Sequence, residues 1–579
     1  MMNNWDIILD EAFNAYNNGR FDQAESLCRQ VISASPGHGD ALFLLGLIAY
    51  QSGALEPAAD LLFQAVKLYP HIENYTLTLA SVLHRQNHLS EALGYYQKFP
   101  QNPKGLAEQG FIYFSLGDKN KALESFQSAL SVSPQLPEAK LGIALLKQDI
   151  KALEKLAKDS HLPDAWFYLS RAYRQTGHLK SALTAIDKTG LKQILYLIEK
   201  ALIYQDLKKY DQALSLYQQA MRLAPHNPDI WANQANIFKA RGEFAAAENY
   251  YKRALAQDDK HLAARHNLAD LLYKMDRIAE SLEQYRTVLI QHPDDVSALY
   301  NLAIILEKTG EYADSLGLYF KVLLSGQAPA GLDWRIANTL ALLAENNQKL
   351  AIDFATGWYK NFPDNPVARH TLFALTGKDE GDNKEYIQKL YDDFSITYDN
   401  KMKELQSCSV VEMKKIIPRQ KYNKALDLGC GTGAWGRAFH KYLGHLIGVD
   451  LSSKMIEIAA HIKSYNKLIK SDILSYLDKD KTKFNLITAL DVLNYAPDVR
   501  PIFTKVSDHL RAGGIFAFSL EVTDKKEPFL GLHGRYLYPK DYLLAELQKV
   551  GLTVLKQKEI PLRLEGKSFA PGLIVVVQK

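Results

Sequence analysis

A small residue recurs at near-regular intervals through the first three quarters of the chain, and this repeat limits the possible fold more than any other feature. The interval is 34 residues at both ends of the array, 30 or 31 through the middle and 36 in the last step. Such a period accommodates a helix, a turn and a second helix, and a small side chain marks the point where two helix backbones approach closely. The positions are Ala24, Ala58, Ala92, Ala122, Ala152, Ala182, Ala213, Ala247, Ser281, Ser315 and Ala351.

The residues around these positions agree with a helical repeat. In "ALFLLGLIAYQSGALEPAADLLFQAVKLYP", residues 41–70, Gly53 falls in the expected turn and Pro70 ends the second helix. Each unit has apolar stripes that it cannot bury alone, so the units must stack into an all-α superhelix. The pattern resembles the tetratricopeptide repeat (TPR) over about residues 5–375, with about eleven units. The 30-residue steps between Ala92 and Ala182 depart from the period of that family.

Three consecutive repeats place an asparagine at the same point of their first helix. These residues are Asn233, Asn267 and Asn301. An amide offers donors and an acceptor, so a column of amides on the concave face would bind the main chain of an extended peptide. The column is similar to the asparagine ladder of the O-GlcNAc transferase repeats. The alternative is that each amide only bonds its neighbour. We expect a protein or peptide partner on this face.

A polar segment, "TGKDEGDNKEY", interrupts the helical pattern, and short β-rich runs alternate with helical ones beyond it. We therefore expect a solenoid over residues 1–375, a linker over 376–384 and a second domain over 385–579. The alternation predicts a doubly wound α/β sheet, which binds ligands at the carboxyl ends of its strands. Seven strands are expected, and the last two have no helix between them, which predicts an antiparallel terminal hairpin.

A glycine-rich loop follows the first expected strand of this domain. Gly429, Gly431 and Gly433 lie in "ALDLGCGTG", residues 425–433, directly before a helical segment. A loop without Cβ atoms turns tightly and lets a ligand lie against its amides. Read from Gly431, "GTGAWG" also fits the dinucleotide fingerprint, so the glycines alone do not identify the ligand.

Three aspartates at strand ends discriminate between the possible cofactors. Asp427 would repel the pyrophosphate of NAD, whereas it would attract a cationic group. Asp450 ends the second strand, 19 residues after Gly431, where a carboxylate would accept hydrogen bonds from both ribose hydroxyls in either cofactor class. Asp472 ends the third strand, within reach of an adenine amino group. The alternative for each acid is a solvated strand end or a helix cap.

Four motifs at successive strand ends resemble those of class I S-adenosylmethionine-dependent methyltransferases. They are "ALDLGCGTG", "GVDLSSKMIEIA", "IKSDIL" and "FNLITALDVLNY", and the similarity covers about residues 385–579. The segment "YDDFSITYDNKMKEL", residues 391–405, is similar to the opening of a bacterial group described as predicted TPR-containing methyltransferases. The resemblance implies a Rossmann-like fold and S-adenosylmethionine as the cofactor.

The resemblance also implies which residues bind that cofactor, and all of them lie near the strand ends or in the opening segment. It implies that Asp427 binds the amino group of the cofactor and that Gly429, Gly431 and Gly433 lie against its methionine part; Cys430, in the same loop, is interpreted as a small buried filler. It further implies that Asp450 and Leu451 bind the ribose and that Met455, Asp472 and Ile473 contact the adenine. Leu490 would lie beside the sulfonium, and Tyr391 and Tyr398 would close over the cofactor. Aromatic faces attract a sulfonium through the cation–π effect. The alternative for the two tyrosines is a core role in a capping helix.

Four residues are candidates for the rim of the acceptor site. Asp491 or His533 would take a proton, Tyr495 would line the pocket, and Arg535 would bind an anionic substrate or the cofactor carboxylate. Relatives carry a histidine and a serine where Tyr538 and Pro539 stand here, so the segment "HGRYLYP" departs from the pattern of its group. The alternative for His533 is that it is an ordinary loop histidine and takes no proton.

The composition of the chain limits which partners and which cellular compartment we expect. Lys plus Arg number 69 against 65 Asp plus Glu, and a net charge of +4 supplies no general attraction to nucleic acid or to an anionic membrane. Neither a signal peptide nor a membrane span is apparent, and the three cysteines form no disulfide framework or metal site. We expect a cytoplasmic methyltransferase whose arm docks a protein substrate or partner. The alternatives are a methyltransferase for a small molecule or glycan with an arm used for assembly, and a non-catalytic scaffold.

Overall fold

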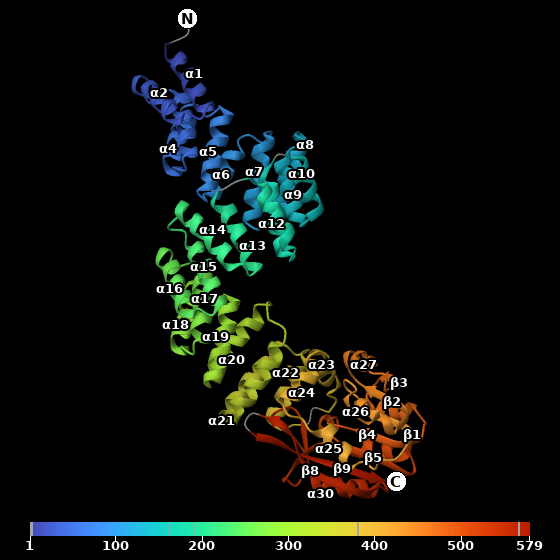
Figure 1. Ribbon diagram of the computed structural model, residues 1–579. Helices are drawn as coiled ribbons and strands as arrows, with labels where there is room; N and C mark the ends of the chain where they lie inside the picture. Colours follow the sequence, from blue (N-terminus) through green and yellow to red (C-terminus); the bar gives the residue numbers. More distant parts are fainter. Residues whose placement is uncertain (1–3, 161, 191–192, 379–380, 566–567) are drawn as a thin grey trace. The chain divides into compact units, whose positions relative to one another are not determined.

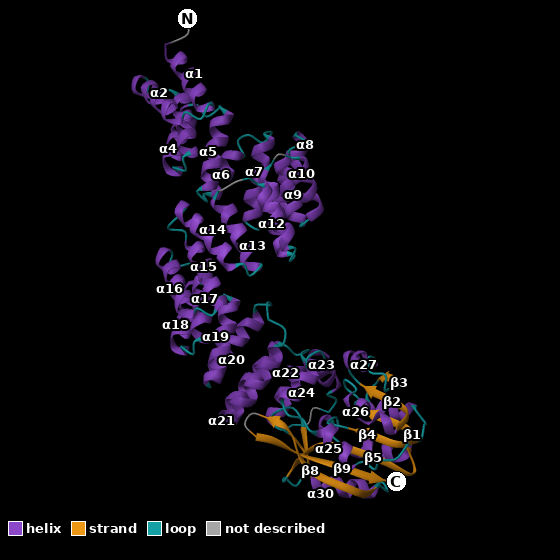
Figure 2. Cartoon of the chain, in the orientation of Figure 1, coloured by secondary structure: helices purple, strands orange, loops and turns teal. Residues whose placement is uncertain are grey.

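Helices precede strands in the computed structural model, which describes residues 4–160, 162–190, 193–378, 381–565 and 568–579 (Figure 2). The chain divides into two units, residues 1–264 and residues 265–579, and each is described separately below. In the described residues of the first unit all regular structure is helical, whereas the second unit contains helices and then a sheet. Residues 379 and 380 of the expected linker lie outside the described residues.

The first unit is a series of helix pairs (Figure 1). Its helices are α1 (Asn4–Asn17), α2 (Phe21–Ala34), α3 (Gly39–Gln51), α4 (Leu55–Leu68), α5 (Glu73–Arg85), α6 (Leu89–Tyr96), α7 (Pro103–Ser115), α8 (Lys119–Val132), α9 (Pro137–Lys147), α10 (Ile150–Asp159), α11 (Pro163–Gln175), α12 (Leu179–Lys188), α13 (Ile194–Asp206), α14 (Tyr210–Leu223), α15 (Pro228–Arg241) and α16 (Phe244–Gln257).

The recurring small residues are buried between the two helices of a pair, with one exception. Ala122 is completely buried and is the fourth residue after Asp118, the N-cap of α8. In α10 the fourth residue after the N-cap, Asp149, is Leu153, which is 1% exposed, whereas Ala152 is only partly buried. The assignment of Ala152 to this register was therefore wrong by one residue, because the helix begins one residue later than the 30-residue spacing suggests.

The middle of the unit has shorter helices, which accounts for the 30-residue steps. Helices α6, α9, α10 and α12 have 8 to 11 residues, against 14 in α2, α4, α14 and α16.

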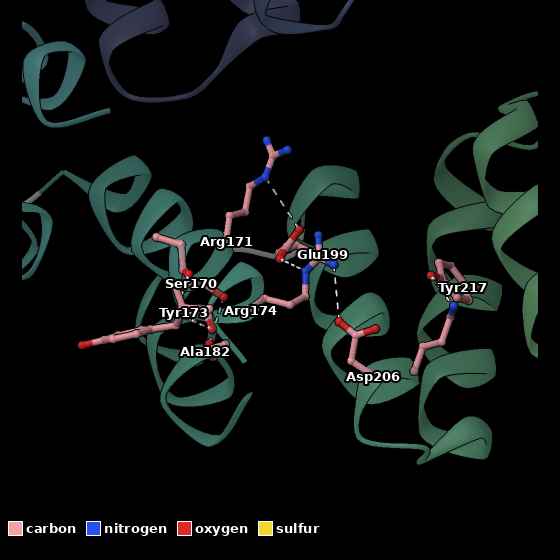
Figure 3. Close-up of polar contacts among 11 residues, drawn as sticks. Ser170, Arg171, Tyr173, Arg174, Ala182, Glu199, Asp206 and Tyr217 are labelled. Carbon is pink, nitrogen blue, oxygen red and sulfur yellow. Dashed lines mark hydrogen bonds and ion pairs between the residues drawn. The ribbon is translucent and has the colours of Figure 1, made fainter. Parts of the chain in front are cut away.

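A buried carboxylate holds part of this stretch together (Figure 3). Glu199 is 4% exposed and accepts a 2.7 Å hydrogen bond from Nε of Arg174, whose guanidinium also lies 3.4 Å from Asp206. Such pairing offsets the cost of burying a charge.

The second unit begins with further helix pairs. Its helices before the sheet are α17 (Leu262–Lys274, which starts at the unit boundary), α18 (Ile278–Gln291), α19 (Val296–Thr309), α20 (Tyr312–Leu324), α21 (Leu332–Asn361), α22 (Pro366–Thr376), α23 (Lys384–Phe394), α24 (Tyr398–Glu404) and α25 (Ser409–Ile416). Helix α21 is broken at Asn347, whose φ of −150° is not helical, so that its halves form a pair of their own. Ser281 and Ser315 occupy the small-residue register, and each hydroxyl donates to a carbonyl of the preceding helix at 2.8 Å.

The sheet has the seven expected strands and two further short ones. The strands are β1 (Tyr422–Leu428), β2 (Leu443–Asp450), β3 (Lys467–Lys470), β4 (Phe484–Ala489), β5 (Leu510–Thr523), β6 (Phe529–Leu530), β7 (Tyr536–Pro539), β8 (Thr553–Glu565) and β9 (Ser568–Gln578). Strands β3, β2, β1, β4 and β5 are parallel, in that order, and β9 pairs antiparallel with both β5 and β8. The terminal hairpin is thereby confirmed, whereas the count of seven strands was too low because β6 and β7 form inside the loop after β5.

Helices pack on the sheet and bury its apolar strands. They are α26 (Ala434–Phe439), η1 (His440–Tyr442), α27 (Ser453–Ala460), α28 (Ile473–Lys479), η2 (Leu493–Tyr495), α29 (Arg500–His509) and α30 (Lys540–Lys549). The core includes Leu426, Ile487 and Phe516, all completely buried, and this arrangement brings the carboxyl ends of β1, β2 and β4 to one edge. None of the described helices is both long enough and apolar enough to cross a membrane.

Candidate active site

The glycine loop after β1 is closed tightly and leaves room beside its backbone. The N–H groups of Gly429 and Cys430 both donate to the carbonyl of Val449, at 2.8 and 3.0 Å. Gly429 has a φ of 69°, and a Cβ there would lie 2.5 Å from the Val492 side chain, so only glycine fits. A Cβ on Gly431, by contrast, would meet nothing within 4 Å. The loop is therefore packed on one side and open on the other.

Asp427 lies at the end of β1 and is 2% exposed. The hydroxyl of Tyr465 donates to its Oδ2 at 2.7 Å, and the hydroxyl of Thr488 donates to its Oδ1 at 2.8 Å. Burial raises the pKa of this carboxyl to about 7, although the two hydrogen bonds act in the opposite direction. A buried acid that titrates near neutrality is well placed to meet a cation.

Asp450 ends β2 and is fixed by backbone donors. Its Oδ2 accepts from the N–H of Gly431 at 2.8 Å, and its Oδ1 accepts from the N–H of Ser452 at 2.9 Å. Burial raises its pKa against these bonds. Each carboxylate oxygen has a further lone pair, so Asp450 keeps the capacity to accept from ribose hydroxyls. Completely buried Met455 lies in the first turn of α27, where its N–H donates to the Ser452 hydroxyl at 3.1 Å.

Asp472 acts as a helix cap, which was the alternative weighed for it. Its Oδ1 accepts from the N–H of Ser475 at 3.1 Å at the start of α28 and lies 3.7 Å from Nζ of Lys384. Burial alone would raise its pKa, but the hydrogen bonds from Ser475 and the charge of Lys384 lower it. Ile473 follows directly and is partly buried. A capping carboxylate retains a second oxygen, so its expected contact with adenine stays a prediction.

The segment of residues 384–404, here called the cap segment, is hydrogen-bonded to the cofactor loops. The Ser452 hydroxyl donates to Asp392 at 2.5 Å, and the Thr432 hydroxyl donates to Asp399 at 2.6 Å. Figure 1 shows α22, α23 and α24 beside one another, and α23 also packs on α27. Indole Nε1 of Trp334, in α21, donates to Asp393 at 2.9 Å. The cap segment thus lies between the last repeat helices and the glycine loop.

Two tyrosines of the cap segment form an aromatic cluster with Tyr495, which follows β4. The ring of Tyr391 lies 5.9 Å from that of Tyr398 and 5.7 Å from that of Tyr495, in edge-to-face arrangements. Burial raises the pKa of the Tyr391 hydroxyl, and the neighbouring Tyr495 raises it further. Burial likewise raises the pKa of Tyr398. Both hydroxyls therefore stay protonated, and their rings offer electron-rich faces to a cation.

Asp491 is held in place between two serines. The hydroxyl of Ser409 donates to its Oδ2 at 2.5 Å, and that of Ser519 donates to its Oδ1 at 2.6 Å. Its φ of 53° is left-handed, a conformation that costs free energy for a residue with a Cβ and that clusters at functional sites. Leu490 is partly buried beside it. The two hydrogen bonds fix the direction in which the carboxylate points.

Arg535 shares a buried glutamate with a second arginine. Its Nε donates to Oε1 of Glu521 at 2.7 Å, and Arg563 pairs with the same oxygen. His533 is exposed by its solvent-accessible surface, but the protein atoms around its ring still desolvate it, and this desolvation together with the charge of Arg535 lowers its pKa. Tyr538, which the resemblance places where a histidine was expected, is completely buried, and its hydroxyl donates to the carbonyl of Ala496 at 2.5 Å.

These residues line a cavity of about 450 Å³ within the second unit. The cavity is lined by α21 and α22 from the last repeats, the cap segment, the loop after β4, the loop before β7, and β8. All four rim candidates line it, together with two of the expected cofactor residues, namely Asp491, Tyr495, His533, Arg535, Tyr391 and Tyr398. The other expected cofactor residues, in the glycine loop and at the ends of β1, β2 and β3, are not among the described residues that line this cavity, and their role stays a prediction.

Several residues of the site were missed in the sequence. Asp392 and Asp399 each follow a tyrosine that was singled out, so the repeated "YD" carried a signal for them. Tyr465 precedes β3, and no sequence motif around it indicated that it belongs to the site. Ser409 and Arg563 lie 82 and 42 residues from the acids they contact, and no local spacing could have paired them.

The expected peptide-binding asparagines lie on first helices of their pairs. Asn233 is in α15, Asn267 in α17 and Asn301 in α19, and all are partly buried. Nδ2 of Asn301 donates to the hydroxyl of Tyr285, on the preceding helix, at 3.1 Å. Asn301 therefore bonds a neighbour, and the role of all three residues in peptide binding stays a prediction.

Comparison with known proteins agrees with the two parts of the chain. Residues 420–543 match a methyltransferase domain, and residues 9–73, 104–136, 193–260 and 266–331 match tetratricopeptide repeats. A TPR repeat-containing protein of Methanocaldococcus jannaschii is 24% identical over 302 residues, or 47% of this chain and 53% of that protein. A ubiquinone biosynthesis O-methyltransferase of Coxiella burnetii is 30% identical over 124 residues, or 21% of this chain and 53% of the relative. The chain spans about half the length of these curated relatives.

The comparison with solved structures found partial matches of low sequence identity. The N-methyltransferase NodS from Bradyrhizobium japonicum is 16% identical and covers 31% of this chain and 98% of its own, with a TM-score of 0.26. A human IFIT1 dimer with PPP-AAAA is 17% identical and covers 57% and 88%, with a TM-score of 0.41. The family matches show that the chain combines tetratricopeptide repeats with a methyltransferase domain, and S-adenosylmethionine is the cofactor that such a domain implies.

Proposed function

We propose that this chain transfers a methyl group from S-adenosylmethionine to an acceptor in the cavity beneath the cap segment, and that its repeats dock the protein that carries or delivers the acceptor. The observation that carries the first part is that Asp491 and three tyrosines line one cavity, whose cap segment is hydrogen-bonded to the glycine loop through Asp399 and Thr432. Residues expected beside the sulfonium and residues suited to bind or deprotonate an acceptor therefore line the same cavity.

The donor set suits this cofactor better than a dinucleotide. Asp427, Asp450 and Asp472 put carboxylates at three strand ends, where a cofactor with an ammonium and a sulfonium gains and one with a pyrophosphate loses. The open side of Gly431 leaves room for a ligand along the backbone. Asp427 would hold the amino group, Asp450 the ribose hydroxyls, and Met455 and Asp472 would lie at the adenine. The NAD alternative is disfavoured on these charges.

S-adenosylmethionine supplies an activated methyl group, so the chain itself mainly positions the acceptor and excludes water. The cap segment serves the second purpose, because it covers the glycine loop through Asp392 and Asp399. Asp491 would accept a proton from an acceptor that arrives protonated, since its carboxylate is held by Ser409 and Ser519 and faces the cavity. His533, with its lowered pKa, is the second candidate for that role.

The arm is proposed to bind a protein because tetratricopeptide repeats present an extended concave surface. Asn233 and Asn267 remain candidates for contacts with a bound peptide, whereas Asn301 would have to exchange its bond to Tyr285. A free small molecule as acceptor, with the arm used for assembly, is the second candidate function. The cavity of about 450 Å³ favours it, because that is the size of a small-ligand pocket.

Calorimetry on the full chain tests the proposal. S-adenosylmethionine should bind and NAD should not, and absence of binding by S-adenosylmethionine would refute the cofactor assignment. Incubation with methyl-labelled cofactor and a lysate then distinguishes the two acceptors. Label on a protein band that disappears without residues 1–260 supports docking, whereas label only on small molecules supports the second candidate.

A further inference from the structure

We propose that the last repeat pair, formed by α21 and α22, supplies the wall of this cavity that recognises the acceptor, and that Asn338 hydrogen-bonds a hydroxyl, carbonyl or amide group of that acceptor. Asn338 would thereby help to determine which molecule is methylated. The inference rests on the proposed function and adds a specificity-determining residue to it. Three observations support it: the position of Asn338, its unused amide and the firm attachment of the wall.

One side of α21 lines the cavity. The lining residues of this side are Trp334, Ala337, Asn338 and Ala341. They follow one another at intervals of three or four, which is the spacing of a single face of an α-helix. They precede the break at Asn347, so they belong to the first helix of the last pair. First helices line the concave face of a tetratricopeptide array, so the last pair turns this face toward the cavity.

Asn338 is the side chain on this face whose hydrogen-bonding capacity is unused. The other polar side chain of the face, Trp334, donates its indole N–H to Asp393 at 2.9 Å. Asn338 is exposed, and no hydrogen bond joins its amide to another of the described residues. An amide offers two donors and one acceptor oxygen. It is therefore able to bond a hydroxyl, carbonyl or amide group of a molecule in the cavity.

Small side chains on the same wall keep room for an acceptor. Ala337 and Ala341 line the cavity from α21, and Ala374 lines it from α22. Beside them the ring of Trp334 lies 5.6 Å from that of Tyr386, so the wall also offers aromatic surface. A hydrogen-bonding group next to aromatic surface fits an acceptor that has a flat ring with a polar edge.

The wall is attached firmly to the methyltransferase domain. His370, in α22, is 1% exposed, stacks on Tyr386 of the cap segment at 3.7 Å and donates from Nε2 to the carbonyl of Gly534 at 3.0 Å. A Cβ on Gly534 would lie 2.8 Å from Nε2 of His370, so the two segments are in close contact. Side chains on such a supported wall keep a defined position relative to the reacting groups.

Variants of the full chain test the inference through two measurements. The first is the transfer of label from methyl-labelled S-adenosylmethionine to acceptors of a cell lysate, and the second is calorimetry of the cofactor. Asn338→Ala should lower labelling about fivefold, as expected for the loss of a hydrogen bond between uncharged groups. Ala337→Leu should lower it about tenfold, because the added side chain occupies space meant for the acceptor. The Kd for S-adenosylmethionine should change less than about twofold in both variants.

Asn361→Ala is the matched control. Asn361 is an exposed asparagine in the second half of the same helix, and its amide donates to the carbonyl of Gly357 at 2.8 Å. Labelling should be unchanged in this variant. An equal fall of labelling in Asn361→Ala would show a general effect on α21 and would contradict a specific role of Asn338.

Three further results would overturn the inference. Unchanged labelling in Asn338→Ala would show that the acceptor does not contact this residue, and a large loss of cofactor affinity would place the wall at the cofactor instead. If Ala337→Leu fails to fold, Asn338→Gln replaces it, because it keeps the amide and should lower labelling less than Asn338→Ala does. Equal losses in these two variants would contradict the hydrogen bond. No labelling by the natural chain would refute the proposed function itself, and the inference with it.

Discussion

The hydroxyl of Thr432, in the glycine loop, donates a 2.6 Å hydrogen bond to Oδ1 of Asp399, in the cap segment. The bond joins two residues that are 33 positions apart in the chain and connects the expected cofactor loop to the cap segment that covers it. A matching bond from Ser452 to Asp392 makes the contact two-point, so the cover is held at both of its helices.

Removal of this bond should weaken cofactor binding. We expect Asp399→Ala to raise the Kd for S-adenosylmethionine about tenfold, because a hydrogen bond to a charged acceptor contributes about 1.5 to 3 kcal/mol. Calorimetry on Asp399→Ala, Thr432→Val and the double variant measures the coupling between the two residues. Additive effects of the two substitutions would show that the bond does not contribute to binding.

The sequence predicted the sheet better than it predicted the cover of the site. Apolar runs broken by turns identify seven strands in order, and a carboxylate at a strand end is visible in a linear pattern, as with Asp427 and Asp450. The cap segment was recognised for its tyrosines, but its orientation depends on Asp392 and Asp399 reaching loops far along the chain. Arg563 lies on the hairpin strand β8, and only the folded sheet brings it to Glu521.

Cofactor affinity should rise with pH around neutrality. The pKa of Asp427 is raised to about 7, so the carboxylate that would attract the cofactor's ammonium group forms fully only above that pH. We expect the Kd for S-adenosylmethionine to fall between about pH 6 and pH 8, and Asp427→Asn to bind weakly with a flat profile. A profile in the natural chain as flat as that of Asp427→Asn would exclude Asp427 from the cofactor site.

The same shift has the opposite effect on the chain without cofactor. Because the folded pKa lies above the ordinary value of 3.8, the folded state holds an extra proton between these values. The stabilisation from Asp427 is therefore complete below about pH 4 and is lost as the pH rises through about 7. Thermal unfolding measures this loss, and the natural chain should become less stable relative to Asp427→Asn, which does not titrate, as the pH rises from about 4 to about 8.

Tyr465 should adjust the titration of Asp427. Its hydroxyl bond lowers the pKa of the carboxyl, so Tyr465→Phe should raise that pKa and move the binding profile to higher pH. Tyr442→Phe is the matched control, because this ring packs on Phe439 in the same domain at 4.8 Å. An unshifted profile in Tyr465→Phe would mean that Asp427 does not govern the pH dependence.

Asp491 should be needed for turnover more than for cofactor binding. Asparagine tolerates the left-handed backbone and keeps the shape of the side chain, but it cannot accept a proton. We expect Asp491→Asn to lower turnover on a protonated acceptor about 100-fold or more while the Kd for S-adenosylmethionine changes less than threefold. Turnover of labelled cofactor with lysate measures the first quantity and calorimetry the second. Unchanged turnover would mean that the acceptor arrives deprotonated or that His533 takes the proton.

Truncation should distinguish the repeats that belong to the second unit from those that do not. Deleting residues 1–260 leaves α17 complete and should change the Kd for S-adenosylmethionine less than threefold. Deleting residues 1–375 also removes Trp358 and His370, which are 1% exposed, and uncovers Tyr386 and Tyr495 in the same core. The longer deletion should therefore lower the unfolding temperature, because burial of such side chains contributes several kcal/mol. Equal unfolding temperatures for the two truncated chains would show that the last repeats do not support the methyltransferase domain.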